Sequence, residues 1–248
     1  ERAIGLEKQV LMPIEDPIEM GHELPKLVLQ LQRDPIYPPL FKLAFGDSKV
    51  SQERIAAALA QFVRSIVSFN SPYDIGLHQV KSPTENFPNF TDEENLGKQQ
   101  FFGRALCAEC HLPDHQDGEM EQWVIFQMVE PGNNGIDRDG SDVDAGVATH
   151  SGRRQDRGKF KPSSLRNIDL TGPYMHDGRF VTVDQVIEHY NWSVNPHENL
   201  DPRLEDFAAN GLALPEVPKV ALAKFLSTLT DKKLLTDPKY SDPFVRDR

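Results

Sequence analysis

The sequence predicts an all-α fold with long loops. Three observations lead to this prediction: a helical spacing of apolar residues over residues 51–69, two capping boxes that each open a helix, and the lack of a set of alternating segments able to form a sheet. With 38% hydrophobic and 26% charged residues, the 248-residue chain has the composition of a folded protein. It contains no apolar run of the roughly 18–20 residues that a membrane-spanning helix needs.

The first predicted helix covers residues 51–69, and Ser51 is suited to cap its first turn. Its apolar residues recur at three- and four-residue spacing. They are Ile55, Leu59, Phe62, Val63, Ile66 and Val67. A stretch rich in proline and asparagine follows over residues 70–90, which is typical of a domain boundary. We therefore expect one domain over residues 1–88 and a second over residues 89–248.

The second domain opens on a helix whose first turn is a capping box formed by Thr91 and Glu94. This helix leads towards the two cysteines of the chain. Residues 215–229 form the closing helix, in which Pro218 suits the first turn. Ala221, Phe225 and Leu229 are predicted to share one face of this helix.

A further helix begins at the capping box of Thr182 and Gln185. Its apolar stripe consists of Val183, Val186, Ile187 and Tyr190. Since each residue advances the helix by about 100°, Tyr190 is predicted to face inward and His189 outward.

Residues 112–158 are predicted to be irregular and acidic. Residues 137–144 superficially resemble a calcium loop, but they lack the glycine and the glutamate that such a loop needs at its sixth and twelfth positions. A solvated acidic loop is therefore the prediction for this stretch.

Both cysteines lie in one pentapeptide, Cys107-Ala108-Glu109-Cys110-His111. This is the pattern of a c-type haem attachment site, in which two thiols bind the porphyrin vinyl groups and the histidine binds the iron. A redox dithiol, a structural zinc site and a local disulfide are the alternatives. A dithiol lacks its usual βαβ surroundings here, zinc lacks further ligands at close spacing, and a disulfide does not account for His111.

The iron of such a haem needs a ligand on its second face, and residues 160–192 are the expected source. Met175, His176 and Tyr190 are the candidate side chains. From the residues alone Met175 ranks first, because histidine–methionine ligation is common in electron-transfer cytochromes. Covalent haem is attached outside the reducing cytoplasm, which predicts a periplasmic location.

These residues resemble the bacterial di-haem cytochrome c peroxidase family, including the methylamine-utilisation di-haem enzymes. The similarity is clearest in residues 9–20, 101–111 and 159–190, the last reading KFKPSSLRNIDLTGPYMHDGRFVTVDQVIEHY. The resemblance implies two cytochrome c-like helical domains that each carry one haem. The N-terminal haem would react with hydrogen peroxide, and the C-terminal haem would receive and store electrons.

The resemblance also implies roles for single residues. Cys107, Cys110 and His111 match the second haem site, and the distal ligand of that haem falls on Tyr190, which then replaces Met175 as the preferred ligand. Other positions match functional residues of the peroxidatic haem and of a calcium site. They are Gln9, Pro13 and Glu19 in the distal pocket, with Glu19 as acid–base, and Thr171 and Pro173 as calcium ligands through their backbone carbonyls.

The family has two haem attachment motifs, whereas these residues contain one. We therefore expect haem c on this chain and a second haem on an N-terminal segment that precedes it. The implied function is a periplasmic, hydrogen-peroxide-dependent di-haem peroxidase or oxidase, and the alternative is a mono-haem electron-transfer cytochrome without catalysis. The net charge of −11 argues against nucleic acid as a partner. It favours a basic electron donor such as a small c-type cytochrome or cupredoxin, and a homodimer is a further expectation.

Overall fold

The computed structural model describes residues 3–111, 130–138 and 144–243. The chain divides into two compact units, Glu1–Val67 and Ser68–Arg248. The predicted boundary at residue 88 therefore differs from the observed division. Residues 68–88 belong to the second unit because Tyr73, Leu77 and Phe87 are buried in its core.

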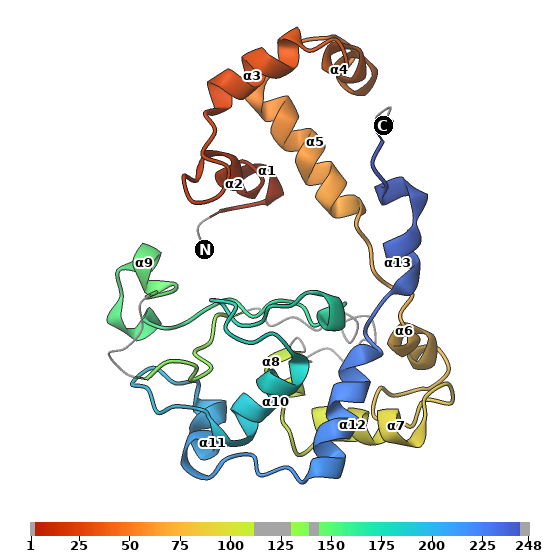
Figure 1. Ribbon diagram of the computed structural model, residues 1–248, viewed down its shortest axis with the longest axis vertical. Helices are drawn as coiled ribbons and strands as arrows, with labels where there is room; N and C mark the ends of the chain where they lie inside the picture. The colour runs from red at the N-terminus through yellow and green to blue at the C-terminus, as the bar shows by residue number, and fades with distance from the viewer. Residues whose placement is uncertain (1–2, 112–129, 139–143, 244–248) are drawn as a thin grey trace. The chain divides into compact units, whose positions relative to one another are not determined.

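The first unit is helical. Its helices are α1 (Leu6–Gln9), α2 (Met12–Glu15), α3 (Leu24–Arg33), α4 (Tyr37–Phe45) and α5 (Gln52–Ser65), shown in red to orange in Figure 1. Phe41, Val50 and Ile55 form its buried core.

Helix α5 confirms one prediction and corrects another. Ser51 caps it by accepting a hydrogen bond from the Arg54 backbone N–H, as expected. The helix ends at Ser65 rather than at residue 69, and it buries Ile55, Ala56 and Ala60. The predicted apolar stripe from residue 59 to residue 67 stays 38–52% exposed. Within this unit the helix buries the side that carries its small residues. Which side of a helix is buried depends on the neighbouring helices and not on apolar spacing alone.

The second unit contains the remaining helices (Figure 1). The α-helices are α6 (Pro72–Leu77), α7 (Asp92–Phe102), α8 (Ala108–His111), α9 (Ala148–Ser151), α10 (Val183–Trp192), α11 (Glu205–Asn210), α12 (Glu216–Ser227) and α13 (Lys232–Thr236). The 3-10 helices are η2 (Arg154–Asp156), η3 (Ile168–Leu170), η4 (Pro202–Leu204) and η5 (Pro238–Tyr240). The described residues contain isolated β-bridges but no β-strand, which agrees with the predicted all-α class.

The predicted helix starts of the second unit are confirmed. Thr91 and Glu94 form the capping box of α7, and Thr182 and Gln185 form that of α10. On α12 and just beyond it, Ala221, Phe225 and Leu229 are at most 2% exposed, as their shared face predicts.

Helices α7 and α12 pack against each other and contribute Phe101, Leu222 and Phe225 to the core of the second unit. Gly97 lies at their crossing, where a Cβ atom would be 1.9 Å from the Ala221 carbonyl oxygen. Only glycine allows the two backbones to come this close. The pair supports α8 and α10 at the adjacent cavity.

None of the helices in the described ranges combines the length and the apolar character that crossing a bilayer requires.

Candidate haem site

The two cysteines and His111 lie on a single helical turn. The backbone N–H groups of Cys110 and His111 both donate to the Cys107 carbonyl, at 3.2 and 3.0 Å. Both thiols are free, so the disulfide alternative is not what the described residues show. Burial raises the pKa of the Cys107 thiol to about 12 and also raises the pKa of Cys110. The thiols therefore stay protonated at neutral pH.

A cavity of about 460 Å³ opens beside this turn. The volume is within the range of small-molecule and cofactor sites. Five parts of the second unit form its wall: the end of α7 with α8, the loop at residues 132–134, the segment 160–176, the stretch 201–212 with η4 and α11, and the helices α10 and α12. Most of the wall is apolar, including Phe101, Leu165, Ile187, Phe207 and Leu226. Such a wall suits a flat apolar ring.

The polar part of the wall is concentrated at a few side chains. Arg203 pairs with Asp201 at 2.6 Å, and its other amino group donates to the Glu109 carbonyl at 2.7 Å. Arg203 thereby ties η4 to the turn that carries the cysteines, while Lys161 lines another part of the cavity. Arg203 and Lys161 thus place two cations on a mostly apolar wall, which matches the carboxylate groups of a haem.

His111 is suited to bind a metal. Its Nδ1 atom is buried and has no hydrogen-bond partner among the described residues. Burial lowers the pKa of its imidazole to about 4, with a smaller effect of the Arg203 charge in the same direction. The ring is therefore neutral at physiological pH, which is the state that coordinates iron.

The three candidates for the second iron ligand all line the same cavity. Tyr190 faces it from α10, as its place in the apolar stripe predicts, and Met175 and His176 face it from the loop before that helix. Burial raises the pKa of the Tyr190 phenol to about 12, although a hydrogen bond from Asn134 acts in the opposite direction. The cavity brings together all three, so the choice between Tyr190 and Met175 remains a prediction.

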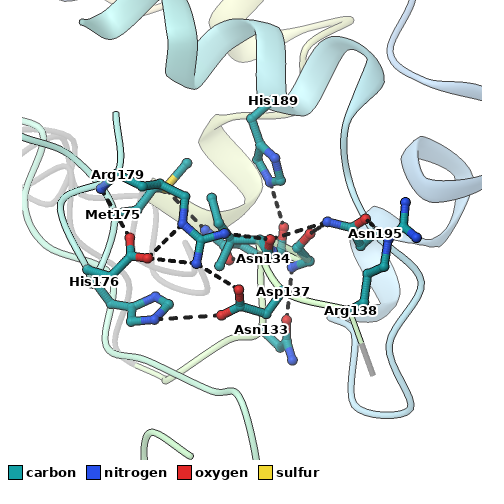
Figure 2. A network of polar contacts seen from close by, with 12 residues as sticks. Asn133, Asn134, Asp137, Arg138, Met175, His176, Arg179, His189 and Asn195 are labelled. Atoms are coloured by element: carbon teal, nitrogen blue, oxygen red, sulfur yellow. Dashed lines mark hydrogen bonds and ion pairs between the residues drawn. The ribbon is translucent and has the colours of Figure 1, made fainter. Parts of the chain in front are cut away.

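His189 is buried, at 3% exposed, which contradicts its predicted outward orientation. Its Nε2 atom lies 3.0 Å from the Asn134 carbonyl oxygen (Figure 2). The loop at residues 132–138 covers that side of α10 and supplies the hydrogen bond that a buried imidazole needs. Helical periodicity counts apolar residues only, and it therefore misses a polar side chain that is buried with a partner.

Asp137 is likewise not the solvated acid that the sequence predicted. It pairs with Arg179 at 2.7 Å and lies 3.8 Å from His176 (Figure 2). Residues 139–143 of that predicted acidic loop lie outside the described residues. His176 also stacks on Phe160, with ring centroids 3.8 Å apart. The contacts with Asp137 and Phe160 fix the side chain of His176, the residue that follows Met175.

The donor set fits a covalently bound haem. Two unbridged thiols and a neutral imidazole lie on one turn, and a mostly apolar cavity with a tyrosine and a methionine on its wall opens beside them. Zinc fits less well, because no group of three or more His, Cys, Asp or Glu residues in the described part of the chain could hold a metal ion. The arrangement can therefore bind a porphyrin on one histidine and offer its second face a further ligand.

The proposed peroxide-pocket residues belong to the first unit. Gln9 ends α1, Pro13 lies in the first turn of α2, and Glu19 follows in the next turn. The Pro13 carbonyl accepts a hydrogen bond from the Met20 backbone N–H at 3.1 Å, which fixes the turn containing Glu19. Gln9 and Glu19 are both exposed. Their catalytic roles remain predictions.

Thr171 and Pro173 flank Gly172 on the cavity wall. Calcium takes six to eight oxygen ligands, and these two positions would supply two backbone carbonyls. The described residues show no cluster of acidic side chains that would complete the set. The calcium site therefore remains a prediction.

Sequence reasoning missed two residues of the site, Asn134 and Arg203. Asn134 lies in an Asn-Asn-Gly tripeptide, which signals a turn but says nothing about what the turn contacts. Arg203 follows a proline in the short 3-10 helix η4, where the sequence gives no sign of a contact with the cavity. Both reach the cavity from segments distant in sequence, so local pattern could not assign them.

Comparisons with known proteins agree with this site. A family model described as di-haem cytochrome c peroxidase matches residues 1–82. The methylamine utilization protein MauG of Methylophilus methylotrophus is 33% identical over 216 residues, covering 85% of this chain and 58% of that protein. The cytochrome c551 peroxidase of Nitrosomonas europaea is 33% identical over 190 residues, covering 75% of this chain and 52% of that protein.

A solved structure is similar along almost the whole chain. It is that of a MauG-like protein associated with microbial copper homeostasis, and it aligns with a TM-score of 0.78 and 30% identity over 98% of this chain and 73% of its own. By contrast, the chain spans between half and three fifths of the two curated relatives above. The sequence similarity, the helical fold and the haem-attachment turn lead to one conclusion: the chain belongs to the di-haem cytochrome c peroxidase family that includes the MauG proteins.

Proposed function

We propose that this chain forms part of a periplasmic di-haem peroxidase or oxidase that consumes hydrogen peroxide. The observation that carries the proposal is the placement of Cys107, Cys110 and His111 on one turn beside a cavity that Tyr190 also lines. A haem bound in that cavity would supply reversible one-electron chemistry between an electron donor and a second, peroxide-reactive haem.

The residues of this chain would divide the work of holding that haem. Cys107 and Cys110 would form thioether bonds, and His111 would provide the proximal nitrogen. Tyr190 would provide the distal oxygen, which favours the higher oxidation states of iron because a phenolate is a hard, anionic donor. Arg203 would hold the attachment turn through the Glu109 carbonyl.

Glu19 would act on the peroxide side, where a carboxyl group within reach of peroxide can accept and return its proton. Gln9 and Pro13 would shape the same pocket. Thr171 and Pro173 would contribute carbonyl oxygens to a calcium ion. The acidic charge of the chain supports a small basic electron donor, such as a c-type cytochrome or cupredoxin.

The test is an intact-mass measurement of the native protein, made together with haem quantification. We expect covalent haem on the peptide that contains Cys107 and Cys110, and its loss in Cys107→Ser/Cys110→Ser. The Glu19→Ala variant should keep that haem and lose peroxide turnover. One haem per native polypeptide, with turnover unchanged in Glu19→Ala, would instead indicate a mono-haem electron-transfer cytochrome.

A further inference from the structure

We propose that a groove between α10 and α12 is the docking surface for the basic electron donor of this chain. The inference rests on the proposed function, since it presupposes haem in the cavity beside the two cysteines. The groove has a volume of about 440 Å³ and is lined by residues of η3, of α12 and of the start of α10. Helix α12 contacts both of the other elements, so all three belong to one packed region of the second unit (Figure 1).

The groove adjoins the haem cavity. Tyr174 and Val183 line both of them, so these two side chains form the wall between the groove and the cavity. Tyr174 is fixed in that wall, because its hydroxyl donates to the Ile168 carbonyl and its backbone N–H donates to the Phe180 carbonyl, both at 2.7 Å. Electron transfer between two proteins requires a short separation of their redox centres. A donor seated in the groove would be separated from the cavity by a single layer of side chains.

Apolar side chains lie exposed at this groove. Val181 and Val220 line it and are 70% and 42% exposed. Val217, which is 70% exposed, lies three residues before Val220 on α12 and therefore on the same side of that helix. Grouped apolar side chains on a protein surface are typical of an interaction site. They would form the apolar centre of the docking surface.

Two carboxylates line the same groove. Asp169 and Asp184 are both exposed, and neither forms an ion pair with any residue in the described ranges. Glu188 lies four residues after Asp184, so the acidic side of α10 continues for a further turn. Negative charge next to an apolar centre matches the usual composition of an interface, in which a polar rim surrounds apolar contacts.

The lysines near the groove do not cancel this charge. Lys224 lines the groove but pairs with Glu93. Lys219 pairs with both Glu188 and Glu216, at 3.0 and 3.1 Å. Each lysine of this part of α12 is therefore already neutralised by a carboxylate. The two aspartates that line the groove leave a surplus of negative charge there.

This combination selects a small basic protein as the occupant. Lysines around an apolar patch on the partner would be attracted by the acidic rim, and the valines would make the apolar contact. A second copy of this chain fits less well, because it carries the same acidic groove and the same net charge of −11. The donor is therefore expected to dock through opposite charge and a small apolar contact.

The experiment measures docking to the haem-loaded full chain. The probe is zinc-substituted cytochrome c, a small lysine-rich protein whose photoexcited porphyrin gives one electron to a ferric haem. The zinc porphyrin becomes a cation radical, and the ferric iron becomes ferrous. The readouts are the dissociation constant from calorimetric titration and the rate at which the excited porphyrin is quenched. The succinylated probe, whose lysines then carry negative charge, tests the role of charge.

Two double variants test the two parts of the groove. Asp169→Asn/Asp184→Asn removes the negative charge at nearly constant shape. Val181→Ser/Val220→Ser removes apolar area and keeps the charge. All four side chains are exposed, so we expect both proteins to fold, and thermal unfolding checks this.

Glu130→Gln/Glu205→Gln is the matched control. Both residues are exposed acids of the second unit that do not line the groove. Glu205 lies in the first turn of α11, as Asp184 lies in the first turn of α10, so the control also matches the effect of charge on a helix start.

We expect the charge variant to bind and quench the probe about fivefold or more weakly at low ionic strength and like the wild type at high ionic strength. The apolar variant should lose about threefold or more at every ionic strength. The control should lose less than about twofold, and the succinylated probe should bind the charge variant more tightly than the wild type.

Groove variants that bind and quench the probe like the control would overturn the inference and leave the proposed function intact. Self-association of the wild type that the groove variants abolish, without an effect on the probe, would assign the groove to a second copy and also overturn it. Absence of covalent haem from the wild type would overturn the proposed function and the inference with it.

Discussion

Lys98 is a fully buried cation in α7 of the second unit. Its amino group donates to the carbonyls of Pro83 and Glu85 and lies 4.1 Å from the centre of the Phe87 ring. Burial lowers the pKa of the Lys98 amine to about 8 from its usual value of 10.5. Lys98 therefore connects the segment after α6 to α7, the helix that precedes the turn with the two cysteines. Its ammonium group loses its proton more readily than that of an exposed lysine.

This shift predicts a pH dependence of stability. Between pH 8 and about 10 the unfolded chain keeps a proton on Lys98 that the folded chain loses, so this group makes the free energy of unfolding rise with pH. Chemical denaturation of the wild type and of Lys98→Met across that range measures the effect. The wild type should gain more stability than the variant, and parallel curves would contradict the shift.

Arg166 and Asp74 form a buried ion pair in the same unit. Their charged atoms are 2.8 Å apart, and the side chains are 10% and 2% exposed. Arg166 also donates to the Ser68 carbonyl, so it ties the start of the second unit to the segment before η3.

Removal of the Arg166 charge should be costly. Arg166→Met leaves the Asp74 carboxylate buried without its cation, and we expect a loss of about 3–5 kcal/mol in the free energy of unfolding. Lys26→Met is the matched control, because the Lys26–Glu23 pair is 65% and 66% exposed and should contribute no more than about 1 kcal/mol. Urea denaturation measures both variants, and equal losses in the free energy of unfolding would show that burial does not strengthen the Arg166–Asp74 pair.

At the scale of elements, the crossing of α7 and α12 determines where the haem-attachment turn lies. Gly97→Ala would place a methyl group 1.9 Å from the Ala221 carbonyl oxygen, which is buried backbone and cannot rotate away. We expect the two helices to separate, with a loss of about 3 kcal/mol or more and a lower haem content.

Gln99→Ala provides the comparison on the exposed side of the same helix, where we expect a change of about 0.5 kcal/mol or less. Thermal unfolding and haem absorbance of both variants measure the difference. A Gly97→Ala protein as stable as Gln99→Ala would show that α7 and α12 do not need their close contact.

At the scale of the whole chain, the net charge of −11 predicts how the proposed electron donor associates. A basic donor should be attracted over a distance comparable to the Debye length, about 10 Å at 0.1 M salt. Stopped-flow reduction of the haem should therefore slow about tenfold or more between low and high ionic strength. An acidic donor of similar potential should show the reverse trend, and a rate independent of salt with the basic donor would exclude electrostatic steering.

Much of the site could be predicted from sequence because its chemistry is local. The cysteines and His111 share one turn, and the helix starts at Thr91 and Thr182 depend on side chains three residues away. The helical repeat alone predicts that Tyr190 faces inward, and Tyr190 lines the cavity. Features that depend only on interactions between residues close in sequence can be predicted from the sequence.

Only the tertiary structure decided the rest. The burial of His189 against Asn134, the hydrogen bond from Asn134 to Met175 and the pairing of Asp137 with Arg179 all join segments that are far apart along the chain. The division of the chain at Val67 likewise depends on long-range packing. A polar side chain can be buried once a distant segment supplies its partner, and an apolar one can stay exposed where no segment covers it. The sequence by itself therefore determined the turn that carries both cysteines and His111 and the all-α class, while long-range packing decided which side chains surround that turn.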